Sequence, residues 1–423
     1  MEQEKSSQGP KTLKHKSISA SKAAVKYVLS SVGGAILFII VANPVTQWWS
    51  GPTSYKVCLV GDFRPGQEGG RFIQEGFLEK GTLSKFKVDG VPVEMVTRDD
   101  EGDPQVAVSI SDELSGADDT LLVVGHLSST QTKAALPNYL RKAIPPIPVV
   151  LASETNPYLY TKRGNQSEVL PILRIAPTDD RQAADAAAFA VKQGATTFWI
   201  IEDDENPVYS KYLASEFIRN VQDQRRNVIF WARKESVPSF ETFRALKPSC
   251  VFFTGSASNA LILIRQLRAF SRVGSIPMPM VLLTDSAVDQ SLIQQGGADV
   301  EGVNAIYPWP ASDFANGNEG FKTIGRDARN VVERLLEDVS KQYSTLRKER
   351  AWLTHWIRST LRIHKTSDAR DTAVAVVEQL FQTKKAYPLS TGGRIAKFSA
   401  EIRNEQAKFH IWKIQDGKFI DVE

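Results

Sequence analysis

The amino-acid sequence predicts an α/β protein with two lobes, each a doubly wound parallel sheet, preceded by one transmembrane helix. Three observations lead to this prediction. Short apolar runs rich in β-formers alternate with amphipathic stretches of helical length, which is typical of βαβ units and parallel sheets. Eight such runs suit two sheets better than one. An uncharged apolar segment near the N-terminus predicts the membrane helix.

Length and composition are those of a folded globular protein. The 423 residues suffice for two or three domains, and 42% hydrophobic and 24% charged residues are ordinary proportions. A net charge of +4 gives no reason to expect a nucleic-acid partner. The two cysteines, Cys58 and Cys250, lie far apart in apolar runs. We interpret them as free buried thiols. Zinc sites need Cys and His ligands close together in the sequence, and this sequence has no such cluster, so we predict no metal site.

The N-terminal segment has the order of features expected of a signal anchor. Residues 1–26 carry six lysines against Glu2 and Glu4, residues 27–47 are uncharged, and Trp48 and Trp49 follow. This order predicts a cytoplasmic tail, a transmembrane anchor over 27–47, and an extracytoplasmic main domain, periplasmic or extracellular. The alternative is a cleaved signal peptide. The long polar region and the bulky Ile40 before a cut after Ala42 favour the anchor.

Residues 51–54 are predicted to form a short linker. Both predicted sheets lie in the part of the chain that follows this linker. Strands are predicted at 56–61, 91–97, 119–125, 147–153, 196–203, 226–232, 250–255 and 280–285. These runs are almost continuously apolar, as expected where helices cover both faces of a sheet. Helical patterns connect several of them, for example over 179–193 and 209–222.

Small polar residues follow several of the predicted strands. In parallel sheets, ligands bind beyond the carboxyl ends of the strands. Hydroxyl groups and backbone N–H groups there can hold an anion, and an acid at a neighbouring strand end can hold a cation, so the pattern suits a zwitterion. The alternative is that these residues only cap helices. The segments concerned are 126–130, 153–155, 256–259 and 285–286.

Several segments resemble the periplasmic leucine/isoleucine/valine-binding proteins, the type 1 solute-binding family of branched-chain amino-acid ABC importers. The most specific are VVGHLSSTQTKAALPNY and PPIPVVLASETNP, and the resemblance extends over roughly 55–423 to the closing WKIQDGKFIDV. It implies a hinged clamshell, with lobe 1 at about 55–176 and 307–391 and lobe 2 at about 177–306 and 392–423. The three crossings between lobes are expected near Pro177, Tyr307–Pro310 and Thr391–Arg394.

The resemblance also implies roles for five residues around a small-molecule ligand, with no cofactor. Ser129 aligns with the serine that binds the ligand carboxylate, and Thr155 with a threonine that contacts both ends of the zwitterion. The backbone carbonyl of Ser153 is expected to accept from the ligand ammonium. Asp285 is expected to pair with that ammonium, and Tyr209 to close over the ligand from the second lobe.

Two departures from the family pattern bear on the ligand. The first loop reads GDFRPGQEGG instead of the usual glycine and serine pattern, so no particular amino acid is predicted. Glu154 replaces a small residue between two of the aligned positions. Pointing inward, it would repel a carboxylate and favour a cationic ligand; pointing outward, it would be a surface acid.

Residues 344–365 form a basic, aromatic segment where the family usually has a short turn. Leu346, Leu353, Ile357 and Leu361 fall at helical spacing, Trp352 and Trp356 lie on an adjoining strip, and several arginines supply positive charge. One hypothesis is that this segment docks to the membrane or to a partner near the anchor. The alternative is a helix extension packed on its own lobe.

Catalytic motifs are missing from the sequence. The first loop lacks the features of a P-loop or a dinucleotide fingerprint, and no nucleophile elbow occurs. We interpret His126 as a structural hydrogen-bonding residue. The prediction is therefore a membrane-anchored extracytoplasmic solute-binding protein, not an enzyme, that serves an ABC permease. The alternatives are a ligand sensor that signals through another membrane protein, and a scaffold of the same fold that binds no ligand.

Overall fold

The structure is a computed structural model that describes residues 52–159, 170–233, 239–309, 311, 317–349, 366–383, 385–389, 395–399, 403–404 and 408–422. These residues all fall in one of the two compact units of the chain; the other unit, 1–51 with 356–364, lies outside them. The predicted tail and anchor, the crossing near 391–394 and most of the segment 344–365 are therefore outside the described residues. Within the described part, no helix combines the length and apolarity that crossing a bilayer requires.

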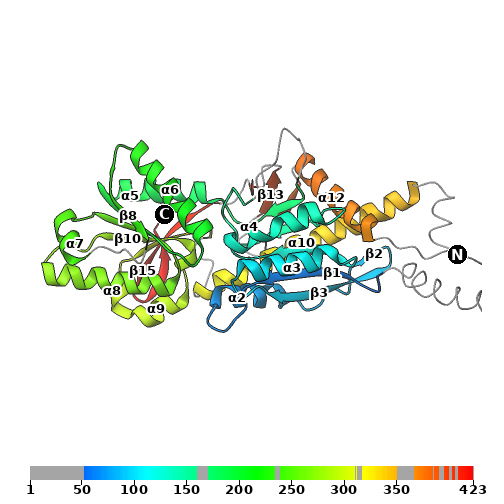
Figure 1. The fold of residues 1–423 in the computed structure, drawn as a ribbon, viewed down its shortest axis with the longest axis horizontal. Coiled ribbons are helices and arrows are strands. Elements are labelled where there is room, and N and C mark those ends of the chain that lie inside the picture. Colours follow the sequence, from blue (N-terminus) through cyan, green and yellow to red (C-terminus); the bar gives the residue numbers. More distant parts are fainter. Residues whose placement is uncertain are drawn as a thin grey trace, which may run out of the picture. The chain divides into compact units, whose positions relative to one another are not determined.

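All eight predicted strands are present, divided between two sheets (Figure 1). The first sheet is parallel apart from its edge strand β2. Its strands, in spatial order, are β2 (Lys87–Val88), β3 (Val91–Asp99), β1 (Tyr55–Gly61), β4 (Thr120–Gly125), β5 (Val149–Leu151) and β6 (Ile172–Arg174).

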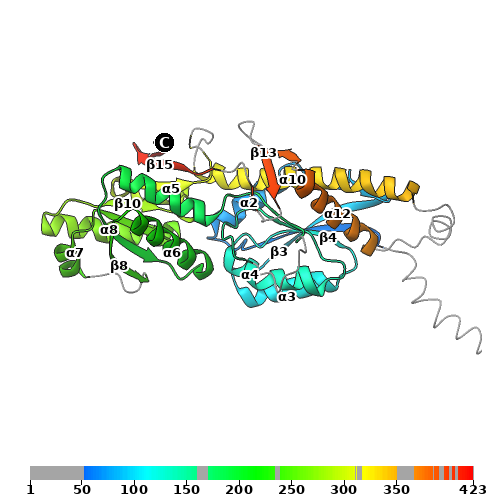
Figure 2. The ribbon, with the colours of Figure 1, turned by 90° about the horizontal axis from the view of Figure 1, so that it is seen from above.

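Helices cover both faces of the first sheet, because alternate side chains of each strand point to opposite faces. Val57 and Leu59 of β1 pack in one core cluster with α2 (Glu68–Leu78), α10 (Gly317–Glu349) and α12 (Thr366–Thr383). The intervening Cys58 and Val60 pack in another. The helical elements of that second cluster are α3 (Pro104–Gly116), α4 (Ser129–Pro137) and η1 (Asn138–Lys142). Figure 2 shows α10 and α12 on one side of the strands and α3 and α4 on the other.

The second sheet has five parallel strands and a C-terminal antiparallel pair. Its strands, in spatial order, are β16 (Lys418–Asp421), β15 (His410–Gln415), β11 (Asn304–Tyr307), β10 (Met280–Leu283), β9 (Cys250–Thr254), β7 (Thr197–Glu202) and β8 (Asn227–Arg233). One face is covered by α5 (Asp179–Lys192) and α6 (Pro207–Asp223). The other face is covered by α7 (Phe240–Leu246), α8 (Ala257–Gly274) and α9 (Gln290–Gly296).

Both cysteines are buried and free, as predicted. Cys58 lies in β1 and Cys250 in β9, each in an apolar cluster. Burial raises the pKa of the Cys58 thiol to about 12, so it packs as a small hydrophobic side chain and not as a nucleophile.

A small third sheet lies beside elements of the first. It consists of β12 (Ala386–Pro388), β13 (Ile395–Ser399) and β14 (Arg403–Asn404), and it contacts α12, α10 and β6. Two of its strands fall in the range 392–423 that we expected in lobe 2, whereas β15 and β16 of that range do join the second sheet. The lobe boundaries themselves stay a prediction.

Candidate ligand-binding site

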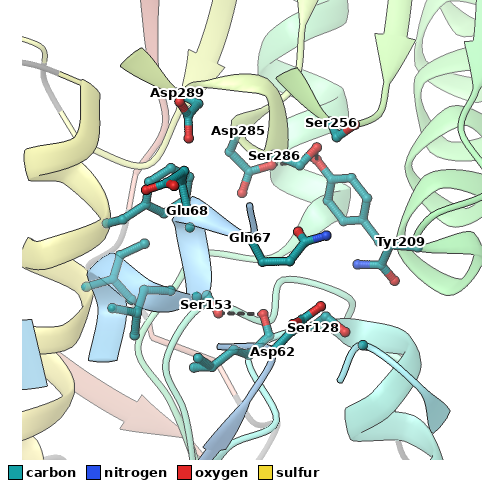
Figure 3. A pocket seen from close by; sticks show the side chains of 18 of the residues that line it. Asp62, Gln67, Glu68, Ser128, Ser153, Tyr209, Ser256, Asp285, Ser286 and Asp289 are labelled. Carbon is teal, nitrogen blue, oxygen red and sulfur yellow. Dashed lines mark hydrogen bonds between the residues drawn. The ribbon is translucent and has the colours of Figure 1, made fainter. Parts of the chain in front are cut away.

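A pocket of about 470 Å³ lies where the loops that follow the strands of both sheets meet. Parallel strands bring their carboxyl ends to one edge of a sheet, so residues from distant parts of the chain converge there. All five residues singled out from the sequence line this one pocket: Ser129, Ser153, Thr155, Tyr209 and Asp285. Figure 3 shows Ser128 and Ser153 on one side and Tyr209, Asp285 and Ser286 on the other. We call these the first-sheet side and the second-sheet side of the pocket.

Ser129 is the first residue of α4, directly after the loop that follows β4. Its side chain lies among pocket residues and makes no hydrogen bond within the described part of the chain, although the residue is only 2% exposed. A free hydroxyl at a helix N-terminus, where backbone N–H groups also point outward, is suited to an anion. Ser153 and Thr155 follow β5 and line the same side.

Glu154 is buried, so its interpretation as a surface acid is wrong. The residue is 1% exposed, and its carboxylate accepts hydrogen bonds from the backbone N–H of Leu127 (3.1 Å) and of Ser153 (3.0 Å) and from the Thr132 hydroxyl (3.1 Å). Burial raises the pKa of this carboxyl group, and its hydrogen bonds act in the opposite direction. Glu154 thus joins the end of β5 to the loop after β4 while still lining the pocket.

The loop held by Glu154 has an uncommon backbone conformation at Leu127. Its φ of 66° lies in the left-handed region, which a leucine seldom adopts. The Leu127 N–H is bound by Glu154, and its carbonyl accepts from the Ser153 hydroxyl at 2.8 Å. The Leu127 side chain covers Gly61, where a Cβ atom would approach its Cδ1 to 2.5 Å. Gly61 of β1 and two residues that follow β5, Ser153 and Glu154, therefore contact the loop that leads to Ser129.

The second-sheet side is organised around the Asp285 carboxylate, which follows β10. The Tyr209 hydroxyl, from the first turn of α6, donates to Asp285 Oδ1 at 2.5 Å, and Gln182 Nε2 donates to the same atom at 2.8 Å. Burial raises the pKa of Asp285 above its ordinary value. Tyr209 and Asp285, predicted separately, are thus in direct contact.

Asp179, at the start of α5, is a residue that sequence reasoning missed. It is 0% exposed, and neither carboxylate oxygen has a hydrogen bond of normal geometry within the described residues. Burial and the nearby Asp285 raise its pKa, whereas Thr155 and Arg174 lower it. The residue lies two positions after Pro177, near which we expected the first crossing between lobes. An acid at the start of a helix looked like ordinary capping, and only its burial distinguishes it.

His126 belongs to a buried hydrogen-bond chain, as interpreted from the sequence. Its Nδ1 lies 2.9 Å from Asp100 Oδ2 and its Nε2 lies 2.9 Å from the Tyr139 hydroxyl. Its backbone N–H donates to the Thr132 hydroxyl. The ring is thereby fixed between the loop that follows β3 and η1, and neither nitrogen is left for chemistry in the pocket.

The unusual first loop forms part of the pocket wall. Asp62 and Arg64 pair with each other at 2.6 Å, and Glu68 begins α2 beside them. Trp309 and Phe321 add apolar surface to the lining. The loop that departs from the family pattern is therefore positioned to affect which ligand fits.

A family model described as periplasmic binding protein matches residues 75–343. This range is more than half of the chain, and the chain belongs to that family, which is one of binding proteins and not of enzymes. The resemblance inferred from the sequence is thus confirmed, as are the α/β fold and its sheets of parallel strands.

Solved structures of binding proteins share the fold. A leucine-binding protein from Thermotoga maritima superposes with a TM-score of 0.65 at 19% identity, over 87% of this chain and 98% of that one. A solute-binding protein of an ABC transporter from R. palustris, in complex with benzoate, has a TM-score of 0.63 at 15% identity, over 87% and 95%. A substrate-binding protein from Desulfitobacterium hafniense, in complex with Leu, has a TM-score of 0.58 at 14% identity, over 87% and 100%. No match is found among curated protein sequences.

Proposed function

We propose that this protein is an extracytoplasmic solute-binding protein that binds an amino-acid-like ligand in the pocket between its two sheets. The observation that carries the proposal is the convergence on one pocket of five residues from four separate strand ends. One side offers the Ser129 hydroxyl and the α4 N-terminus to a carboxylate; the other offers Asp285 to an ammonium group. Charge-assisted hydrogen bonds at both ends would fix the orientation of such a ligand.

We further propose that residues 27–47 anchor the protein in the membrane and that it delivers its ligand to an ABC permease. The lysines before this segment and the tryptophans after it support an extracytoplasmic domain. The fold shared with substrate-binding proteins of ABC transporters supports the importer role. Protease protection of the N-terminal tail in sealed spheroplasts tests the orientation. Cleavage of the tail from outside would contradict it.

A thermal-shift screen of the full-length protein in detergent tests ligand binding. The compounds are the common L-amino acids, with benzoate included because a fold relative binds it. A ligand at about 100 times its Kd should stabilise the protein by roughly 2.7 kcal/mol. Benzoate has no ammonium group for Asp285, so we expect amino acids to shift the melting temperature and benzoate to leave it unchanged. If no amino acid shifts it, the proposal is wrong.

A further inference from the structure

The lining of the pocket is strongly acidic. Within the part of the chain that the structure describes, seven acidic residues line it but only one arginine, Arg64, and no lysine. The acidic residues are Asp62, Glu68, Asp100, Glu154, Glu205, Asp285 and Asp289. An excess of one sign inside a cleft of low dielectric constant raises the local concentration of oppositely charged solutes.

Basic partners or backbone N–H groups balance the acids on the first-sheet side. Asp62 pairs with Arg64, Asp100 with His126 at 2.9 Å, and Glu68 with Arg71 at 3.2 Å. Glu154 has two backbone N–H donors and a hydroxyl donor, with Arg174 close enough to lower its pKa. Glu154 therefore already occupies the Leu127 and Ser153 amides, which a ligand carboxylate could otherwise use.

The acids on the second-sheet side have only neutral partners among the described residues. Asp285 accepts from Tyr209 and Gln182, Asp289 accepts from the backbone N–H of Ser291 at 2.6 Å, and Glu205 accepts from Asn259 Nδ2 at 2.9 Å. No Lys, Arg or His nitrogen of the described residues lies within 4.0 Å of these three carboxylates. Asp289 is only 8% exposed. Figure 3 shows Asp285 and Asp289 on neighbouring turns, with Glu68 directed toward the same space from the other side.

Another buried acid, Asp179, lies next to this side of the pocket without being part of its lining. The Asp179 carboxylate is fully buried against Thr155 and Asp285, two pocket residues, with neither oxygen in a hydrogen bond of normal geometry within the described part. Several carboxylates in one buried region repel each other and lose hydration when a ligand displaces water. One ammonium group in the pocket can pair with Asp285, but it leaves Asp289 without a cation.

We propose that the ligand carries a net positive charge and is an amino acid with a cationic side chain. Its carboxylate binds at Ser129 and Thr155, its α-ammonium binds at Asp285, and its side-chain cation binds at Asp289. This inference rests on the proposed function and narrows it to one class of solute. The buried carboxylates are stabilised in the complex because the two cationic groups replace the water that they lose.

Matched ligand pairs test the inference by isothermal titration calorimetry on the full-length protein in detergent. L-Lysine is compared with Nε-acetyl-L-lysine, and L-arginine with L-citrulline; in each pair only the first ligand carries a side-chain charge. We expect the charged member of at least one pair to bind at least tenfold more tightly than its neutral counterpart. Asp289→Asn should remove that preference and leave the affinity for the neutral member within about twofold. Asp299→Asn, which changes an exposed acid paired with Arg265, is the matched control.

Two outcomes overturn the inference, and only the second also contradicts the proposed amino-acid function. If neutral amino acids bind as tightly as the charged ones and lose affinity on Asp285→Asn, the cationic class is wrong but the amino-acid site stands. If benzoate binds while no amino acid of either class does, both the cationic class and the amino-acid function are wrong.

Discussion

The two sides of the pocket use acidic residues in opposite ways. On the first-sheet side, the Glu154 carboxylate is satisfied by groups of the protein itself, because it accepts hydrogen bonds from the Leu127 and Ser153 amides and the Thr132 hydroxyl. On the second-sheet side, the Asp285 carboxylate accepts from the Tyr209 hydroxyl and the Gln182 amide, and neither oxygen of the nearby Asp179 has a hydrogen bond of normal geometry within the described residues. A buried carboxylate with enough donors fixes a loop, whereas one with too few remains able to bind a cation. The position of an acidic residue after a strand therefore does not indicate whether it binds the ligand or holds a loop.

This contrast gives the pocket a polarity. Free donors remain on the side of Ser129, and unbalanced negative charge lies on the side of Asp285. A ligand with an anionic and a cationic end can bind in only one orientation. Substitutions on the two sides should therefore differ in whether they change affinity or stability.

The largest effect is expected from Asp285→Asn. Removing the charge that faces the ligand ammonium should lower affinity about 100-fold, which corresponds to roughly 2.7 kcal/mol. The unliganded protein should be no less stable, because the buried, poorly solvated charge is removed and the Asn oxygen can still accept from Tyr209. Calorimetry with the best amino acid of the screen, together with thermal unfolding, checks both. An equal loss of affinity in the Asp299→Asn control would contradict the assignment.

A smaller, pH-dependent loss of affinity follows from the raised pKa of Asp285. The ligand ammonium pairs with the ionised carboxylate, so affinity should fall as pH decreases through this pKa, starting at higher pH than for an ordinary aspartate. The unliganded protein should respond in the opposite direction. Because the pKa is higher in the folded than in the unfolded state, ionisation of Asp285 disfavours folding, and its protonation at lower pH restores stability.

The difference between wild type and Asp285→Asn, measured from pH 4 to 8, isolates this group from other titrating residues. The wild type should lose affinity over that range while the variant stays nearly flat. Parallel pH profiles for the two proteins would show that Asp285 does not face the ligand charge.

On the other side of the pocket, Glu154→Ala should act mainly on stability. It leaves two buried backbone N–H groups without an acceptor and releases the left-handed Leu127, so the free energy of unfolding should fall by about 2 kcal/mol. Glu154→Gln keeps one acceptor oxygen and should lie between Ala and wild type. Urea unfolding measures the series, with the exposed Glu241→Ala as control. If Glu154→Ala lowers affinity more than Asp285→Asn does, the contrast between the two sides is wrong.

The sequence predicted the fold better than the site, for a physical reason. Buried parallel strands give nearly continuous apolar runs in the sequence, so all eight predicted strands exist, whereas β6, which ends in Arg174, and β11, which begins with Asn304, were not predicted. The five residues were assigned from the family resemblance, and four of them also lie in the polar segments that follow predicted strands. The buried state of Glu154 and Asp179 could not be found in this way. The donors that hold Glu154 inside the protein, Leu127 and Thr132, lie 27 and 22 residues away in the sequence, so no local pattern indicates them.

The smallest effect is expected from Ser129→Ala. The substitution removes one hydroxyl from the carboxylate end of the ligand but leaves the backbone N–H groups of the α4 N-terminus in place, so affinity should fall about fivefold, or roughly 1 kcal/mol. Stability should not change, because the hydroxyl has no hydrogen bond within the described part of the chain. Calorimetry on Ser129→Ala, with the exposed Ser84→Ala as control, checks this.

The double variant of Ser129→Ala with Asp285→Asn tests whether one ligand spans both sides of the pocket. If it does, the two losses of affinity should be coupled, because a ligand released at one end can shift at the other. Strictly additive losses would mean that the two residues do not hold opposite ends of the same molecule.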